Sequence, residues 1–305
     1  MSTAQQLNTR FGIDGQLGFR EDASGLIVAE IGNPLATASL CLQGAHLMTW
    51  QPRSQAEPVI WLSRDVRLAA GKSIRGGVPV CWPWFGAHAS EHSFPAHGYA
   101  RTVPWQVIES GTGPGGATRL MLRLTKNEKT RAYWPHDARL ELAVSVGEKL
   151  RMELSTENNG GSGITISEAL HAYFRIGDIG AVRVTGLAGC DYWDKAGGST
   201  LKKQDGIIRF AGETDRVYIN TAAECAIEDD ALKRRIHVAK SGSHSTVVWT
   251  PWTAKADKMG DLGQPVGWRE MLCVESANAI GNALHVAAGT KHTLMVEYRA
   301  EPLQP

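Results

Sequence analysis

Residues 139–154 read RLELAVSVGEKLRMEL, and this stretch decides the fold class. Apolar side chains alternate with polar ones up to Val146 and again from Leu150, on either side of a turn at Gly147-Glu148-Lys149. A two-residue period is typical of a half-buried strand, and a short glycine-bearing turn between two such runs is typical of a hairpin. The stretch therefore predicts two antiparallel strands.

Similar runs recur along the chain, separated by turn sequences rich in glycine, asparagine and serine. They lie at 26–31, 40–50, 117–125, 164–176, 246–250, 271–276 and 291–299. Helical windows are few and short, and the sequence shows no linker, low-complexity block or internal repeat. We therefore expect an all-β protein, one large antiparallel β-sandwich over residues 1–305 with few short helices.

Composition narrows the class of protein. A hydrophobic content of 43% and a charged content of 21% are ordinary for a globular domain. The net charge of +1 gives no field that would attract nucleic acid or an anionic membrane. No apolar run approaches the ~18 residues of a membrane span, and the N-terminus lacks the pattern of a signal peptide. Five scattered cysteines without a C-x-x-C pair indicate reduced thiols, so we expect a cytoplasmic protein.

Segment 74–101, IRGGVPVCWPWFGAHASEHSFPAHGYAR, predicts a binding loop. Its prolines exclude a continuous helix, because each proline removes an amide donor and collides with the preceding turn. Aromatic faces occur together with histidines such as His97 and with an arginine near each end, Arg75 and Arg101. That mixture suits a polar, ring-shaped ligand that carries negative charge.

Other readings of this loop stay open or are rejected. Trp82 and Trp84 can instead fill a core under a turn, a common place for tryptophan. The loop histidines His88, His92 and His97 have no accompanying group of acidic residues and cysteines, so we expect no metal site, and we expect His88 and His92 to be exposed.

Two glycine motifs also fail as phosphate-binding signatures. Residues 111–116 match G-x-G-x-x-G, but a strand pattern follows where a dinucleotide site needs a helix. Gly71-Lys72-Ser73 lacks the upstream glycine of a phosphate loop, because that position holds Val66.

The run ITISEALHAYFRI at 164–176 places a histidine on a polar strand face. Alternation puts Thr165, Ser167, His171, Tyr173 and Arg175 on one side and apolar residues on the other. An imidazole titrates near neutrality, so His171 can donate or accept a proton if this face lines a cleft. A histidine on a strand surface is the alternative.

The run MLCVES at 271–276 carries one carboxylate, Glu275, at the end of a strand that is otherwise apolar on both faces. Burial raises the pKa of a carboxyl group toward the range of a general base at neutral pH. The residues 276–279 that follow are expected to form a loop, where functional sites tend to lie. The alternative is a structural ion pair with Arg269 or Arg75.

Two further loops combine carboxylates with aromatic rings, at 189–195 (GCDYWDK) and 213–218 (ETDRVY). Carboxylates accept hydrogen bonds from sugar hydroxyls, and aromatic faces cover the C–H face of a sugar ring. Aspartate-rich turns are also common without any function.

Several of these strings together resemble a known family. IRGGVPVCWPWFG, FPAHGYAR, LHAYFRIGDI, GLAGCDYWDK, ETDRVYIN and MLCVESANA, in this order between about Gly44 and Tyr298, resemble the glucose-6-phosphate 1-epimerase (hexose-6-phosphate mutarotase) group of the aldose 1-epimerase superfamily. The resemblance implies a galactose mutarotase-like supersandwich that binds a sugar across one concave sheet. Thr250 departs from the pattern, since relatives are expected to carry asparagine there, and the change could alter a loop hydrogen bond.

The resemblance also implies roles for individual residues. His171 matches the catalytic acid and Glu275 the catalytic base. His97 and Asp215 match positions that contact the sugar, Arg75 one that contacts sugar or phosphate, and Arg101 is a phosphate ligand by its place in HGYAR.

The implied reaction interconverts the α and β anomers of a hexose 6-phosphate. Glu275 removes the proton of the C1 hydroxyl while protonated His171 donates to the ring oxygen, and the opened ring recloses on the other face. No hydride or phosphoryl group moves, so we expect neither cofactor nor metal, and we expect a monomer whose only partner is the sugar phosphate.

Three other functions stay open at this stage. They are a noncatalytic sugar-binding protein, a mutarotase of unphosphorylated aldoses, and a glycoside hydrolase or lyase. The last would need a second carboxylate beside Glu275, either Asp194 or Asp215.

Overall fold

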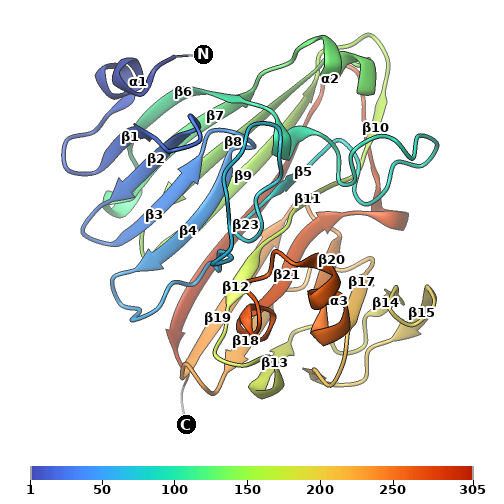
Figure 1. The fold of residues 1–305 in the computed structure, drawn as a ribbon. Helices are drawn as coiled ribbons and strands as arrows, with labels where there is room; N and C mark the ends of the chain where they lie inside the picture. The colour runs from blue at the N-terminus through green and yellow to red at the C-terminus, as the bar shows by residue number, and fades with distance from the viewer. Residues whose placement is uncertain (1, 304–305) are drawn as a thin grey trace.

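The computed structural model describes residues 2–303 and consists mainly of antiparallel strands arranged in sheets (Figure 1). The largest sheet has nine strands. In spatial order they are β16 (Ile208–Arg209), β13 (Val182–Thr185), β18 (Cys225–Asp229), β19 (Arg234–Ser241), β23 (Lys291–Pro302), β9 (Lys149–Asn158), β8 (Ala138–Val146), β7 (Thr118–Leu124) and β6 (Trp105–Thr112).

A second sheet of eight strands carries the site described below. Its order is β15 (Thr200–Lys203), β14 (Asp191–Asp194), β17 (Thr214–Tyr218), β20 (Ser245–Thr250), β21 (Met271–Asn278), β11 (Glu168–Leu170) and β5 (Val80–Cys81), with β12 (Tyr173–Arg175) also paired to β21.

Smaller sheets and helices complete the described chain. The four-stranded sheet, blue in Figure 1, comprises β1 (Leu17–Glu21), β2 (Ile27–Gly32), β3 (Ala36–Cys41) and β4 (His46–Pro52). A two-stranded sheet pairs β10 (Ile164–Ile166) with β22 (Leu284–Val286). The α-helices are α1 (Ala4–Phe11), α2 (Glu128–Tyr133) and α3 (Trp252–Met259). This architecture confirms the all-β class with few short helices, and within 2–303 no helix is long and apolar enough to cross a membrane.

The hairpin predicted from 139–154 lies inside the nine-stranded sheet, between β23 and β7. Strands β8 and β9 pair from Ala138 with Asn158 to Val146 with Leu150. Alternate side chains such as Leu142 and Leu154, which lie opposite each other, are fully buried. The alternation in the sequence therefore reports the core face of this sheet correctly.

The eight-stranded sheet packs one of its faces on the nine-stranded sheet. Phe174 of β12 meets Tyr298 of β23 edge to face, with ring centroids 5.1 Å apart. The buried carboxylate of Glu168 on β11 lies 3.1 Å from the imidazole of His292 on β23. Side chains alternate along a strand. The neighbours of Glu168 and Phe174 in the sequence therefore point away from the core, toward a cavity.

Two runs that were expected to be continuous are broken in the structure. Run 164–176 forms β10, β11 and β12, and His171 lies in the gap between the last two. At this gap the backbone pairs with segment 77–79, which is not part of a strand. His171 N donates to Pro79 O at 3.0 Å, and Tyr173 N donates to Gly77 O at 2.9 Å. Run 40–50 is split into β3 and β4 by a turn at 42–45.

A glycine fixes the loop that carries His97. Gly98 has a φ of 73°, and a Cβ atom there would lie 2.0 Å from the carbonyl oxygen of Trp82. Gly86, in the same loop, has a φ of 77°, but a Cβ atom there would meet nothing within 4 Å. A side chain at Gly86 would therefore meet only the penalty of a left-handed backbone, whereas one at Gly98 would meet that penalty and a steric collision.

We predict that Gly98→Ala lowers the free energy of unfolding by more than about 2 kcal/mol, because it adds a collision with backbone to the left-handed backbone penalty. Gly86→Ala should cost about 1 kcal/mol, since it carries only the penalty. Urea unfolding followed by circular dichroism measures both. Equal losses in the two variants would contradict the close approach at Gly98.

Candidate functional site

All six site residues predicted from the sequence line one cavity of about 780 Å³ on the open face of the eight-stranded sheet. His171 and Glu275 come from the sheet, Asp215 comes from β17, and the other three come from segment 74–101. Those three are Arg75, His97 and Arg101. The structure thus brings together residues that lie far apart in the sequence.

Strand register explains why the sheet residues share this face. Trp249 on β20 pairs with Asp215 on β17 on one side and with Cys273 on β21 on the other. Two residues along β20, Val247 pairs with Glu275. Paired residues point to the same face, so a row of polar and aromatic groups faces the cavity.

His171 and Glu275 form a direct pair. Nε2 of His171 lies 3.2 Å from Oε1 of Glu275, whose side chain is 2% exposed, against 12% for the histidine. The other polar atoms of the pair, His171 Nδ1 and Glu275 Oε2, are buried and have no hydrogen-bond partner within the described chain. Buried polar atoms are usually paired, so a substrate is a plausible partner for both.

Two expectations about Glu275 are tested by the structure: that a loop follows it, and that it forms a structural ion pair with an arginine. Glu275 lies inside β21, which continues to Asn278, because β20 and β11 still pair with residues 276–278 where a loop was expected. The proposed structural ion pair is absent from the described residues: Arg269 binds Asp178 at 2.6 Å and Arg75 binds Asp261 at 3.0 Å.

Burial controls the protonation of the pair. Loss of water lowers the pKa of His171, and the nearby His97, Arg101 and Arg75 lower it further. Burial also raises the pKa of Glu275, as expected from the sequence, and the Asp215 carboxylate adds to that rise. Both shifts favour the neutral forms of the two side chains, whereas the reaction implied by the resemblance uses a protonated histidine and an ionised glutamate.

His97 stands beside this pair in a constrained conformation. Its φ is 64°, its ring contacts Phe85 edge-on at 4.8 Å, and the His171 ring lies 5.8 Å away. Burial, together with Arg101 and Arg75, lowers its pKa to about 3, so the ring is neutral. Nδ1 accepts from Gly86 N at 3.4 Å, which leaves the hydrogen on Nε2, where it can be donated to a ligand oxygen.

The cations of the cavity differ in availability. Arg75 is held by Asp261, to which its Nε donates at 3.0 Å, and by the Tyr173 hydroxyl, to which Nη1 donates at 3.0 Å. Arg101 donates only to the backbone oxygen of Ala96, at 2.8 Å, and has no carboxylate partner among residues 2–303. Lys195 likewise forms no ion pair in the described chain.

Asp215 faces the cavity with a perturbed carboxyl group. Burial raises its pKa, although Lys255 and Lys195 act in the opposite direction. A carboxylate that is partly withdrawn from water, beside cations, can accept hydrogen bonds from ligand hydroxyls.

Sequence reasoning missed several residues that line the site. Tyr173 stacks on the His171 ring, with centroids 5.0 Å apart and planes 12° apart, and the alternation of 164–176 did place both on one face. Lys195 also lines the cavity and ends loop 189–195, which the sequence did indicate. Trp249 and Asp261 line it too, but nothing in their local sequence signals this, because distant strand pairing brings them there.

Other candidate residues lie elsewhere. Asp194 binds Lys202 at 2.7 Å outside the cavity lining, which leaves Asp215 as the only second carboxylate of the two considered. His92 is exposed as expected, but His88 is half-buried against Trp84, at a centroid distance of 4.7 Å. Its backbone-facing Nδ1 accepts from Glu91 N at 3.1 Å, which explains this position.

The two tryptophans of the loop are structural, and Thr250 is inert. Trp82 Nε1 donates to Thr156 Oγ1 and Trp84 Nε1 donates to Pro95 O, both at 3.0 Å. The Thr250 hydroxyl is buried and has no partner in the described chain, so it does not form the loop hydrogen bond considered from the sequence.

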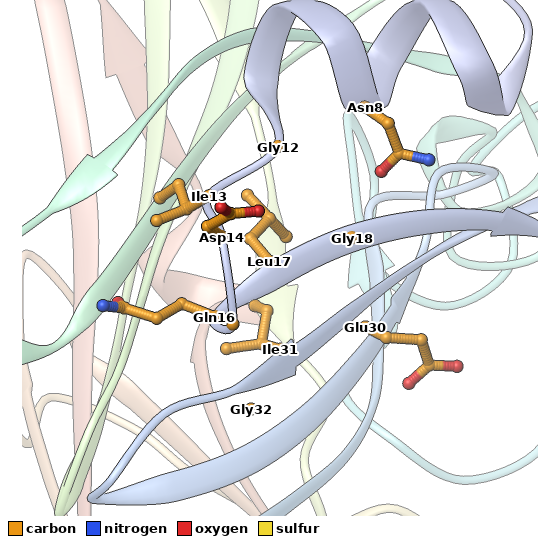
Figure 2. Close-up of a pocket in the computed structure, with 11 residues that line it drawn as sticks. Asn8, Gly12, Ile13, Asp14, Gln16, Leu17, Gly18, Glu30, Ile31 and Gly32 are labelled. Carbon is orange, nitrogen blue, oxygen red and sulfur yellow. The ribbon is translucent and has the colours of Figure 1, made fainter.

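A second hollow, of about 690 Å³, lies between α1 and strands β1 and β2, but its polar groups do not converge (Figure 2). Figure 2 shows Asp14, Gln16 and Glu30 pointing in different directions. Glu30 is engaged by Arg20 at 2.7 Å. The sheet cavity is therefore the better candidate site.

Fold and site together define a β-sandwich protein with a buried imidazole–carboxyl pair in a polar cavity. Residues 28–299 match the aldose 1-epimerase family, and the chain belongs to this family. This membership confirms the resemblance seen in the sequence and the expectation of an epimerase.

Comparison with individual relatives agrees with this family membership. A protein of Escherichia coli K12 named "Putative glucose-6-phosphate 1-epimerase" is 40% identical over 85% of this chain and 84% of its own length. A protein of the same name from Cenchrus ciliaris is 33% identical over 79% of this chain and 74% of its own. The crystal structure of a "putative mutarotase" from Salmonella typhimurium covers 96% of both chains with 34% identity and a TM-score of 0.88.

We predict that Glu275→Gln raises the free energy of unfolding at pH 7 above that of wild-type protein. The folded pKa of Glu275 lies above its unfolded value, so as the pH rises the unfolded chain ionises first and wild-type protein loses stability. Glutamine does not ionise, so the variant does not lose stability in this way, and its amide can still donate to His171 Nε2. Urea unfolding between pH 4 and pH 8 measures the gap, which should close near pH 4.

The exposed Glu91→Gln is the matched control and should show no gap that grows with pH. A constant difference between wild type and Glu275→Gln across this range would contradict a raised pKa at Glu275.

Proposed function

We propose that this chain interconverts the α and β anomers of a hexose 6-phosphate, and that glucose 6-phosphate is its substrate. The observation that carries the proposal is the buried His171–Glu275 pair, 3.2 Å apart, in a cavity that also holds the unpaired cation Arg101. Family membership and the names of the relatives support the same activity.

The pair supplies the acid and the base of ring opening. Glu275 takes the proton of the C1 hydroxyl and His171 gives one to the ring oxygen, so the C1–O5 bond breaks and an open aldehyde forms. Rotation about C1–C2 and reversal of both transfers then close the ring on the opposite face. Each positioned group contributes about 100- to 10,000-fold to the rate.

This assignment requires the proton of the free pair to move from Glu275 to His171 when the sugar binds. The contact between Oε1 and Nε2 provides the path. A phosphate dianion beside Arg75 and Arg101 opposes the two cations that lower the pKa of His171, and so favours its protonated form. The substrate's own charge therefore helps to prepare the acid.

The remaining groups recognise the substrate. His97 donates to a sugar oxygen and Asp215 accepts from a hydroxyl, while Trp249 offers an apolar face at the floor of the cavity. Arg101 and Lys195 bind the phosphate, because a guanidinium matches its geometry and both side chains lack a competing carboxylate in the described chain. Arg75 completes this positive wall.

No step moves a hydride or a phosphoryl group, so the chemistry requires no cofactor. All five cysteines are free thiols, in keeping with the cytoplasmic location proposed from the sequence. The monomeric state and the absence of nucleic-acid and membrane partners remain predictions.

We predict that His171→Gln and Glu275→Gln each reduce enzyme-catalysed anomer exchange by about 100- to 10,000-fold, because each removes one of the two proton-transferring groups. Exchange NMR on equilibrated glucose 6-phosphate measures the rate, and urea unfolding shows whether the variants are folded. Catalysed exchange at wild-type rates in both variants would contradict the roles given to the pair, and exchange no faster with wild-type protein than without protein would favour a noncatalytic sugar-binding protein.

We predict that Arg101→Met raises KM for glucose 6-phosphate by about 10- to 100-fold, because a charged hydrogen bond contributes about 1.5–3 kcal/mol. The rate with unphosphorylated glucose should change little. Lys255→Met is the control: this lysine also lines the cavity, but Glu213 already binds it at 2.7 Å, so a smaller effect is expected. Equal losses with both sugars would instead indicate a mutarotase of free aldoses.

A further inference from the structure

Three side chains of types that bind metals lie close together: His171 and Glu275 line the cavity, and Cys273 is fully buried beside them. The imidazole of His171, the thiol of Cys273 and the carboxylate of Glu275 place one ligand atom each within 4.8 Å of the others, the one such cluster within residues 2–303. Cys273 and Glu275 are alternate residues of β21 and point to the same face, while His171 stands opposite them in the gap between β11 and β12. Sequence analysis predicted no metal site, because this cluster forms only through strand pairing.

The donor atoms are free to accept a cation. Glu275 Oε2 is buried, belongs to a residue that is 1% exposed, and has no hydrogen-bond partner within the described chain. No arginine or lysine of this part of the chain forms an ion pair with Glu275, so no fixed cation already occupies its place. A buried carboxyl oxygen without a hydrogen-bond partner, close to a thiol and an imidazole, is unusual for a purely structural contact.

The ligand types select among metals. Nitrogen, sulfur and carboxylate together suit Zn²⁺, whereas Mg²⁺ and Ca²⁺ prefer oxygen ligands alone. Ligands that lie about 2.0–2.3 Å from a tetrahedral zinc ion are roughly 3–4 Å from each other. The 3.2 Å between His171 and Glu275 already meets this, and no two of the three ligand atoms lie more than 4.8 Å apart.

We propose that His171, Cys273 and Glu275 form a binding site for Zn²⁺ or a similar thiophilic divalent cation, with the fourth position open to the cavity, and that the bound cation blocks the enzyme. The blocking part rests on the proposed function, since it requires His171 and Glu275 to be the catalytic pair. The binding part does not, because it depends only on the three ligands.

Charge balance favours such binding in a buried place. A thiol and a carboxyl that bind Zn²⁺ each give up a proton, so the metal adds little net charge to a buried site. Other charged and titratable groups near the cluster include Arg75, Arg101, His97, Asp215, Cys81 and Tyr173.

Cobalt binding tests the site without reference to activity. Wild-type protein titrated with Co²⁺ should develop a thiolate-to-cobalt charge-transfer absorption in the near ultraviolet, and Zn²⁺ should displace it. Cys273→Ser should abolish the band. Cys190→Ser, which removes a thiol outside the cavity lining, should keep it. No band in wild-type protein, or an unchanged band in Cys273→Ser, would overturn the proposal.

Zinc inhibition tests the consequence. Exchange NMR with glucose 6-phosphate should show inhibition by micromolar Zn²⁺ that added substrate relieves, and none by equal Mg²⁺, which controls for cation binding to the sugar phosphate. Cys273→Ser and Cys273→Ala, assayed without metal, should retain exchange. Their inhibition constant for Zn²⁺ should rise at least about tenfold, because even outer-shell partners of metals contribute 10- to 100-fold.

The outcomes separate the two proposals. A wild-type protein that shows the cobalt band but never catalyses anomer exchange would overturn the proposed function and leave the metal site standing. Zinc inhibition that is equal in wild type and both Cys273 variants would overturn the metal site and leave the function standing.

Discussion

The site depends on one arrangement, a carboxyl group and an imidazole held in contact at the edge of a cavity, with little exposure to water and without an ion pair to an arginine or lysine of the described chain. A buried ionised carboxylate is costly, so burial raises the pKa of Glu275, and the same burial lowers the pKa of the neighbouring imidazole. Neither group reaches this state on an exposed strand. The eight-stranded sheet creates it by presenting one face to the core and the other to a cavity.

The arginines around the His171–Glu275 pair are arranged so that they form no ion pair with the Glu275 carboxyl in the described chain. Asp261 and the Tyr173 hydroxyl hold Arg75 at the wall, which prevents that guanidinium from forming an ion pair with Glu275. Arg101 is left with a single backbone partner. A cavity that contains positive charge without neutralising its own base is therefore ready for an anionic substrate.

How much of this could be predicted from the sequence depends on the range of the interaction. Alternation within single segments predicted the strands, the face that carries His171 and the isolated carboxylate Glu275. It did not predict the contact between them, because that distance depends on how β21 pairs with chain segments a hundred residues away. The role of Asp261 in holding Arg75 could not be predicted for the same reason. The break in the strand at His171 depends on backbone hydrogen bonds to another segment, which the local sequence pattern does not encode.

The division of labour between loop and sheet has a consequence for how such proteins diversify. Of the groups proposed to recognise the substrate, three lie on segment 74–101, whereas the proposed acid and base belong to the sheet and its strand gap. Substitutions in that loop can change which group on the far end of a sugar is accepted without altering strand register or the burial of the pair. The scaffold thus separates heritable variation in substrate choice from variation in chemistry, and new specificities can arise while the reaction is conserved.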